Sequence, residues 1–122
     1  MKEIRFRAWD GENMIYSVAV MNGTVYTIGE EGSLYRLTNY RKIAKPIPLQ
    51  YTGLKDKNGV DIYEGDIVTY SDGISRFLNI IVYQEDAAMF ILDSFRHEQI
   101  PKIIEVIGNI YQNKELLEET AT

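Results

Sequence analysis

Apolar and polar residues alternate along most of the chain, which is the pattern of short strands that bury one face. In the first run, Ile4, Phe6 and Ala8 share one face, and the residues between them share the other. The pattern therefore predicts a mainly β protein. The predicted strands cover residues 4–9, 14–21, 24–28, 33–37, 50–54, 60–63, 67–70, 77–83, 89–92 and 103–111.

Turns that contain glycine separate these strands and indicate which of them pair. Asn22-Gly23 is a strong hairpin signal, because both central residues of a two-residue turn take a positive φ. Residues 24–28 should therefore pair back onto residues 15–20, and the first third of the chain should form a β meander. Short strands joined by glycine corners continue beyond residue 50, and this spacing suggests a small barrel.

The alternation stops between residues 38 and 48, where Pro46, Pro48 and several basic residues occur. We expect a boundary here, with an N-terminal β region in residues 1–48 and a small barrel in residues 49–122. After the last strand, Asn113 fits a helix N-cap and glutamates follow in the first turn. The sequence therefore predicts a short C-terminal helix.

Composition narrows the possible chemistry. The 122 residues include no cysteine, which removes disulfides, thiolate metal sites and cysteine nucleophiles. The first residues lack the apolar core of a secretory signal, and no run approaches the roughly 18–20 apolar residues of a membrane span. We therefore expect a cytoplasmic protein that does not enter a membrane.

The net charge of −5 argues mildly against a protein whose main task is to bind phosphate backbones. One segment nevertheless interleaves aromatic rings with cations, as single-stranded nucleic-acid binders do. The alternative is that the rings pack on the sheet while the cations are solvated, since tyrosine favours strands in any case. This basic-aromatic segment comprises Tyr35, Arg36, Tyr40, Arg41, Lys42 and Lys45.

Three carboxylates, Asp61, Glu64 and Asp66, could form an acid–base pair or bind a divalent cation. No histidine or further acidic cluster accompanies them at a defined spacing, so a solvated turn is the favoured interpretation. Asp66 is expected to accept hydrogen bonds from nearby backbone amides, as turn aspartates do.

His97 is the single histidine, and a dyad with Ser94 is the sharpest catalytic hypothesis for it. The segment lacks a glycine-flanked nucleophile and an orienting acid, so a surface loop is favoured. A phosphate-binding loop is also unsupported, because Gly29-Glu30-Glu31-Gly32 places two acids where bare amides are needed. We assign no catalytic, cofactor-binding or metal-binding residue.

Three blocks together resemble the YopX family of phage and prophage proteins. They are IRFRAWDGENM at residues 4–14, QYTGLKDKNGVDIYEGDIV at residues 50–68 and IEVIGNIYQNKELL at residues 104–117. Lys114 departs from the family pattern, which favours proline at the first helical position. Lysine at this position should lower the stability of the helix only slightly.

The resemblance implies an N-terminal β region packed with a C-terminal SH3-like barrel, a bacteriophage or prophage origin, and no established molecular activity. The shared motifs appear structural rather than catalytic. Gly53, Gly59 and Gly65 stand where hairpins and corners require unusual backbone angles, and Asp66 and Gly108 belong to the same structural set.

Two function classes follow from these observations. The first is a protein-interaction module that docks a host or phage protein, or copies of itself as a homo-oligomer, through sheet edges and exposed aromatic residues. Trp9 either anchors such a partner or, as the favoured interpretation, caps the seam between the two regions. The alternative is a nucleic-acid-associated protein that uses the basic-aromatic segment. SH3-like barrels perform both roles, so the fold alone does not choose between them. We expect no enzyme and no cofactor.

Overall fold

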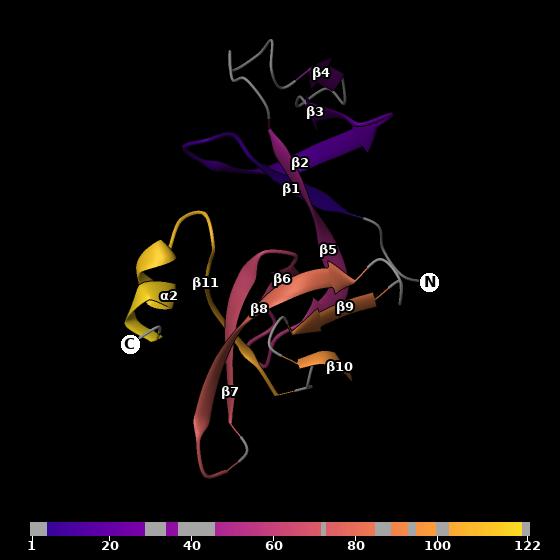
Figure 1. The fold of residues 1–122 in the computed structure, drawn as a ribbon. Helices are drawn as coiled ribbons and strands as arrows, with labels where there is room; N and C mark the ends of the chain where they lie inside the picture. Colours follow the sequence, from indigo (N-terminus) through magenta and orange to yellow (C-terminus); the bar gives the residue numbers. More distant parts are fainter. Residues whose placement is uncertain are drawn as a thin grey trace. The chain divides into compact units, whose positions relative to one another are not determined.

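The computed structural model describes residues 5–28, 34–36, 46–71, 73–84, 89–92, 95–99 and 103–120. Side chains are described for all of these except residues 84, 89–92, 95–99 and 118–120. The chain forms two compact units, Met1–Tyr51 and Thr52–Thr122. Its described elements are eleven strands and one short C-terminal helix, so the prediction of a mainly β protein is confirmed (Figure 1).

The N-terminal unit contains an antiparallel sheet with the strand order β4-β3-β2-β1-β5. Its core lies on one face, where Ala8, Val18 and Val25 are buried and neighbouring apolar side chains pack against them. Four strands precede β5: β1 (Phe6–Trp9), β2 (Met14–Met21), β3 (Thr24–Ile28) and β4 (Leu34–Arg36).

The hairpin between β2 and β3 forms as the sequence predicts. Asn22 and Gly23 both take positive φ, at 49° and 77°, and Met21 pairs with Thr24 across the turn. Two consecutive positive φ angles match the right-handed twist of the strands that they join. The tight turn therefore sets the register of the β2–β3 pair.

Strand β5 (Ile47–Lys55) runs through both units. Its first residues pair with β1, with Phe6 opposite Gln50. Its later residues neighbour β6 (Asp61–Tyr63), where the Thr52 hydroxyl donates to the Ile62 carbonyl at 2.7 Å. Strand β5 therefore lies between β1 and β6 in one sheet of six strands, β4-β3-β2-β1-β5-β6.

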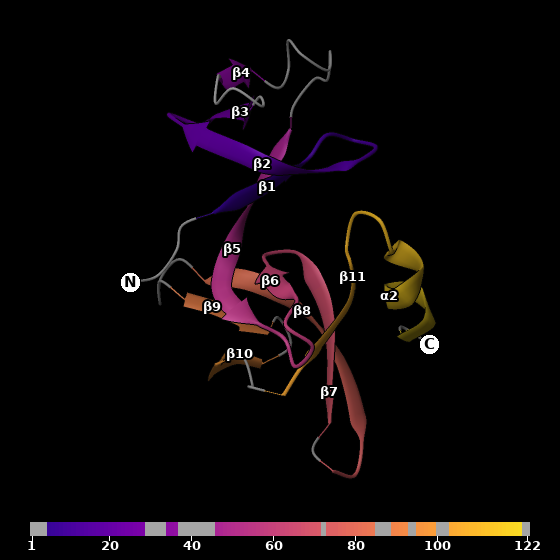
Figure 2. The ribbon, with the colours of Figure 1, turned by 180° about the vertical axis from the view of Figure 1, so that it is seen from behind.

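The second unit also contains an antiparallel sheet of five strands in the order β10-β9-β8-β7-β11. The β7–β8 hairpin projects beyond β6, β9 and β10 in both views (Figure 2). These strands are β7 (Asp66–Ser71), β8 (Arg76–Gln84), β9 (Met89–Leu92), β10 (Phe95–Gln99) and β11 (Glu105–Asn109).

The core of the second unit is aliphatic. Ile62, Val68, Ile81 and Ile104 are buried together, and Tyr70 and Val106 pack against this cluster. These residues come from β6, β7, β8 and the start of β11, so the cluster joins the β5–β6 pair to the five-stranded sheet.

Backbone hydrogen bonds reinforce the same junction at two points. The amide of Lys57 donates to the Ile104 carbonyl at 3.0 Å. At the other point, the Gly65 amide donates to Ile81 and the Gly65 carbonyl accepts from Ile110. Among the described residues, strand pairing alone does not form a closed barrel. The backbone hydrogen bonds of Lys57 and Gly65 instead connect the β5–β6 side to the five-stranded sheet, as in a small barrel. The SH3-like form of the barrel stays a prediction.

The last strand leads through a tight turn into helix α2 (Lys114–Thr120), which lies beside β11 in both views (Figure 1 and Figure 2). The Asn109 side-chain oxygen accepts from the amides of Tyr111 and Gln112, at 3.0 and 2.9 Å. Asn113 directly precedes the helix, as predicted, but its side chain points backward and accepts from the Asn109 amide at 3.0 Å. The helix-capping role assigned to that side chain is therefore wrong, because the turn competes for the same oxygen.

Two further expectations are corrected. Residues 95–99, which include His97, form strand β10 rather than a loop. The segment is polar because β10 is the last strand of the described sheet and has one partner, so no apolar alternation marks it. Pro48 lies inside β5 rather than in a break, since proline is tolerated near the start of a strand.

The close approach of Gly108 to Asn113 gives a test of the C-terminal turn. A Cβ atom at Gly108 would lie 2.6 Å from the Asn113 Oδ1 atom and 2.9 Å from its Cβ atom. We expect Gly108→Ala to lower the free energy of unfolding by about 1–3 kcal/mol, because the turn must open to accept the methyl group.

Urea denaturation followed by circular dichroism would measure this loss. The Asn113→Gly variant removes the colliding atoms, so the cost of Gly108→Ala should shrink in that background. An equal cost in both backgrounds would show that the collision does not explain the glycine.

Candidate interaction surface

The central polar residue of the second unit is Asp56, which follows β5. One carboxylate oxygen accepts from the amides of Asn58 and Val60 at 2.8 and 2.9 Å, and the other accepts from Val106 at 3.0 Å. Val106 lies on β11, fifty residues further along the chain. The carboxylate therefore closes its own turn and attaches that turn to the last strand.

Burial of Asp56 by itself raises the pKa of the carboxyl group. The three amide hydrogen bonds and the nearby charge of Lys57 outweigh this effect, so the pKa lies below its ordinary value of 3.8. The group is therefore an anion under ordinary conditions, and its acceptor sites are occupied by backbone amides.

Other polar residues of the central block also hold the fold. The buried Thr52 hydroxyl bridges the Ile62 carbonyl and the Leu54 amide. The Asp66 carboxylate accepts from the Tyr63 amide at 2.7 Å, which is the local role predicted for it. Asp61 pairs with Lys55. The arrangement of these carboxylates therefore serves turns and strand pairing.

The glycines of this block take the backbone angles that their turns require. Gly53, Gly59 and Gly65 have φ values of 88°, 83° and 89°, which side-chain-bearing residues rarely adopt. Glycine is required at position 108 for a different reason, because the Asn113 side chain occupies the space that a Cβ atom would need.

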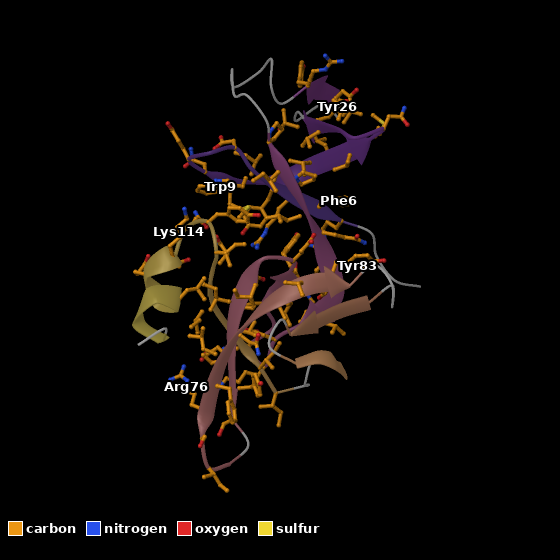
Figure 3. All side chains as sticks on the ribbon, viewed as in Figure 1. Phe6, Trp9, Tyr26, Arg76, Tyr83 and Lys114 are labelled. Atoms are coloured by element: carbon orange, nitrogen blue, oxygen red, sulfur yellow. The ribbon has the colours of Figure 1, made fainter. Side chains whose placement is uncertain are left out.

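A separate feature of the second unit is an open hollow of about 380 Å³ beside the β7–β8 hairpin. Two cations line it together with hydroxyl groups, one acid and two isoleucines. Figure 3 shows Arg76 on the projecting hairpin. The lining residues of this hollow, which we name the hairpin hollow, are Lys57, Thr69, Tyr70, Ser71, Arg76, Ile103, Ile104 and Glu105.

Two aliphatic side chains of the second unit are unusually exposed. Ile103, which lines the hairpin hollow, is 75% exposed. Ile74, in the turn between Ser71 and Arg76, is 93% exposed and is not among the lining residues. The rings of Tyr70 and Phe77 stack beside this turn at 5.3 Å between centroids and stiffen the hairpin. The turn of this hairpin thus presents the Ile74 side chain to solvent, where it is available for contact.

The N-terminal sheet exposes a second apolar region. Met21, Ile28 and Leu34 are exposed and share the face opposite the buried Val25, as strand alternation and the pairing of Ile28 with Leu34 require. Trp9 is only half buried. On β1, the Arg7 guanidinium donates to the Tyr16 hydroxyl at 3.3 Å.

The basic-aromatic segment lies mostly outside the described residues. Tyr35 and Arg36 are on β4 and are exposed. Tyr40, Arg41, Lys42 and Lys45 lie outside the described residues, as does Ser94, and the His97 side chain is not described. The nucleic-acid interface and the Ser94 dyad therefore stay hypotheses.

Sequence reasoning missed the hairpin hollow. Ile103 was an ordinary member of the apolar run at residues 103–111, Ile74 lay between two predicted strands, and Lys57 and Arg76 were isolated cations. An aliphatic residue directly after the Asp-Gly pair of a turn was the available signal, since turn positions are usually polar.

In the described part of the chain, no three histidine, aspartate or glutamate side chains gather in a way that could hold a metal ion. The same part contains no helix that is long and apolar enough to cross a bilayer. Fold and side chains together define a mainly β protein of two units whose recurrent polar motifs hold turns together.

The family assignment agrees with this class. The chain matches the YopX protein family over residues 5–118, and it belongs to that family. The resemblance in the three sequence blocks is thereby confirmed.

Two solved structures resemble the chain over nearly its full length. The crystal structure of protein EF1440 from Enterococcus faecalis is 29% identical, with a TM-score of 0.68, and the match covers 96% of this chain and 99% of that one. The crystal structure of protein yopX from Bacillus subtilis is 22% identical, with a TM-score of 0.56 and coverages of 95% and 98%, and shows the same fold. No curated protein matches the chain significantly.

The lowered pKa of Asp56 predicts a pH-dependent loss of stability. The unfolded chain binds more protons than the folded chain near pH 3.8, so the contribution of the carboxylate is present above that value and is lost as the pH falls through the folded-state pKa. We expect Asp56→Asn to destabilise the protein by about 1–3 kcal/mol near neutral pH, because an amide nitrogen then faces a backbone amide.

Urea denaturation at a series of pH values would test this prediction. The difference between the original protein and the Asp56→Asn variant should narrow as the pH falls below about 4. The matched control is Asp61→Asn, which breaks the more exposed pair with Lys55 and should cost at most about 1 kcal/mol. A gap that stays constant with pH would contradict the assigned role.

Proposed function

We propose that this chain is a phage or prophage accessory protein of the bacterial cytoplasm that acts as a protein-interaction module rather than an enzyme. The observation that carries the proposal is the exposure of two isoleucines of the second unit, Ile74 in the β7–β8 turn at 93% and Ile103 before β11 at 75%. Exposed aliphatic side chains cost free energy in water, and burial against a partner recovers it. Membership of the YopX family supports the phage or prophage origin.

The exposed face of the N-terminal sheet supports the self-assembling part of the proposal. Met21, Ile28 and Leu34 are exposed apolar side chains on one face of this sheet, and Leu34 lies on the short strand β4. Faces of this kind are commonly buried between copies in a symmetric homo-oligomer. The two exposed regions lie in different units, so self-association and partner binding can be tested separately.

The partner-binding proposal is tested by replacing both exposed isoleucines. We expect Ile74→Ser with Ile103→Ser to abolish the capture of a specific protein from nuclease-treated bacterial host lysate, as read by mass spectrometry, because the contact loses its apolar anchors. The variant should keep the original circular dichroism spectrum, since both side chains are exposed.

A matched control is available in the same unit. Leu54 and Val60 are also exposed, at 47% and 48%, and lie outside the hairpin hollow. Leu54→Ser with Val60→Ser should keep the captured protein. Equal capture by both double variants would remove the hairpin surface from the proposal, and capture that disappears on nuclease treatment would favour nucleic acid.

The second candidate function is nucleic-acid association through the basic-aromatic segment, and the exposure of Tyr35 and Arg36 on β4 favours it. Rings and cations at such a site bind bases and phosphates together. Binding of a single-stranded oligonucleotide should then fall steeply with salt, because phosphate contacts release counterions.

Charge reversal tests this candidate. We expect Arg41→Glu with Lys42→Glu to lower the affinity at least tenfold, as measured by fluorescence anisotropy at low salt. The matched control, Lys57→Glu with Lys114→Glu, reverses the same number of charges outside the segment and should bind as the original does. Binding that is insensitive to salt, or equal in both variants, would refute this function.

A further inference from the structure

The hairpin hollow combines positive charge with aliphatic surface, and this combination restricts what it can bind. Lys57 lies in the turn after β5, Arg76 begins β8, and Ile103 precedes β11. Three segments that are far apart in the sequence therefore contribute to one open space of about 380 Å³.

Neither cation forms an ion pair with an acid of the described residues, although the charge of Lys57 lies near the buried Asp56 carboxylate. Among the described residues, the Arg76 guanidinium donates a hydrogen bond to the Thr69 hydroxyl at 3.3 Å, and this bond occupies one of its five N–H donors. The planar guanidinium is well suited to bind carboxylates.

The one acid of the hollow is partly occupied. Glu105 accepts a hydrogen bond from the Asn58 side-chain amide at 3.1 Å. The hollow thus carries two cations and one acid, although the whole chain has a net charge of −5. The lining therefore has one more cation than acid, with the buried Asp56 carboxylate beside Lys57, and this excess favours a ligand that carries an anionic group.

The isoleucines decide which kind of anion fits. A small anion such as phosphate would satisfy Lys57 and Arg76 but would leave Ile74 and Ile103 in water. A peptide that carries both carboxylate and aliphatic side chains would satisfy both features, because the aliphatic groups cover the isoleucines while the carboxylates meet the cations.

We propose that the hairpin hollow binds a segment of a partner protein in which acidic and aliphatic side chains are neighbours. This inference rests on the proposed interaction function and adds the chemistry of the partner. Lys57 and Arg76 hold the carboxylates, Ile74 and Ile103 anchor the aliphatic groups, and Glu105 limits how much negative charge the site accepts.

The test is a peptide array in which the number of acidic and the number of aliphatic residues vary independently. The probe is the full-length labelled protein. We expect binding to require both residue types and to weaken as the salt concentration rises from about 50 mM to about 300 mM, because the charged contacts are close to solvent.

Four single variants then separate the roles by titration with the best peptide of the array. Lys57→Gln and Arg76→Gln should each weaken binding by about two- to fivefold, as expected for partly exposed ion pairs. Glu105→Gln should strengthen it by about twofold, because it removes a repulsive charge. Lys114→Gln is the matched control: Lys114 is exposed at the start of α2, away from Arg76 (Figure 3), and its loss should have no effect.

Two results would overturn the inference. One is an array without preference for acidic peptides, or with a preference that Lys57→Gln and Arg76→Gln leave unchanged. The other is binding of inorganic phosphate or a mononucleotide that is lost in the same variants and does not depend on Ile74 and Ile103, which would make the hollow a small-anion site.

Failure of the inference is distinguishable from failure of the proposed function. If the serine variants of Ile74 and Ile103 lose a captured protein while the array shows no acidic preference, the interaction function stands and the partner chemistry is wrong. If neither experiment depends on the hairpin hollow, both proposals fall.

Discussion

The second unit depends on one buried carboxylate. Asp56 satisfies the amides of its own turn and of Val106, so a residue after β5 controls the position of the last strand. Without that acceptor the Val106 amide would lose its hydrogen-bond partner. The neighbouring hydrogen bond from the Lys57 amide to the Ile104 carbonyl would then be held less firmly in place. The aliphatic cluster of Ile62, Val68, Ile81 and Ile104 requires this junction, because its members come from both sides of it.

The same junction places the hairpin hollow. Lys57 directly follows Asp56, and Ile104 and Glu105 directly precede Val106. The bonds that hold the fold thus bring Lys57, Glu105 and the exposed Ile103 to one side of the β7–β8 hairpin. The Asp56 hydrogen bonds and the hairpin hollow are formed by neighbouring residues of the sequence but by different atoms. The hydrogen bonds use a buried carboxylate and backbone amides, whereas the hollow is lined by side chains.

Much of the fold could be predicted because its signals are local. The Asn22-Gly23 turn requires positive φ angles that few residue pairs accept, and the aliphatic run of β8 has no other plausible role. Strand β10 escaped prediction because a polar edge strand lacks alternation, and the Asn113 side chain was misassigned because two local acceptor roles compete. The hairpin hollow could not be predicted, since it joins residues 57, 76 and 103, whose proximity depends on the tertiary fold.

The continuity of β5 has a consequence for how errors are avoided during folding. A strand has a single register, and a slip of one residue against β1 would turn every side chain of β5 to the opposite face. Thr52 would then no longer present its hydroxyl to the Ile62 carbonyl. Correct pairing of Phe6 with Gln50 therefore also favours the register in which β5 meets β6.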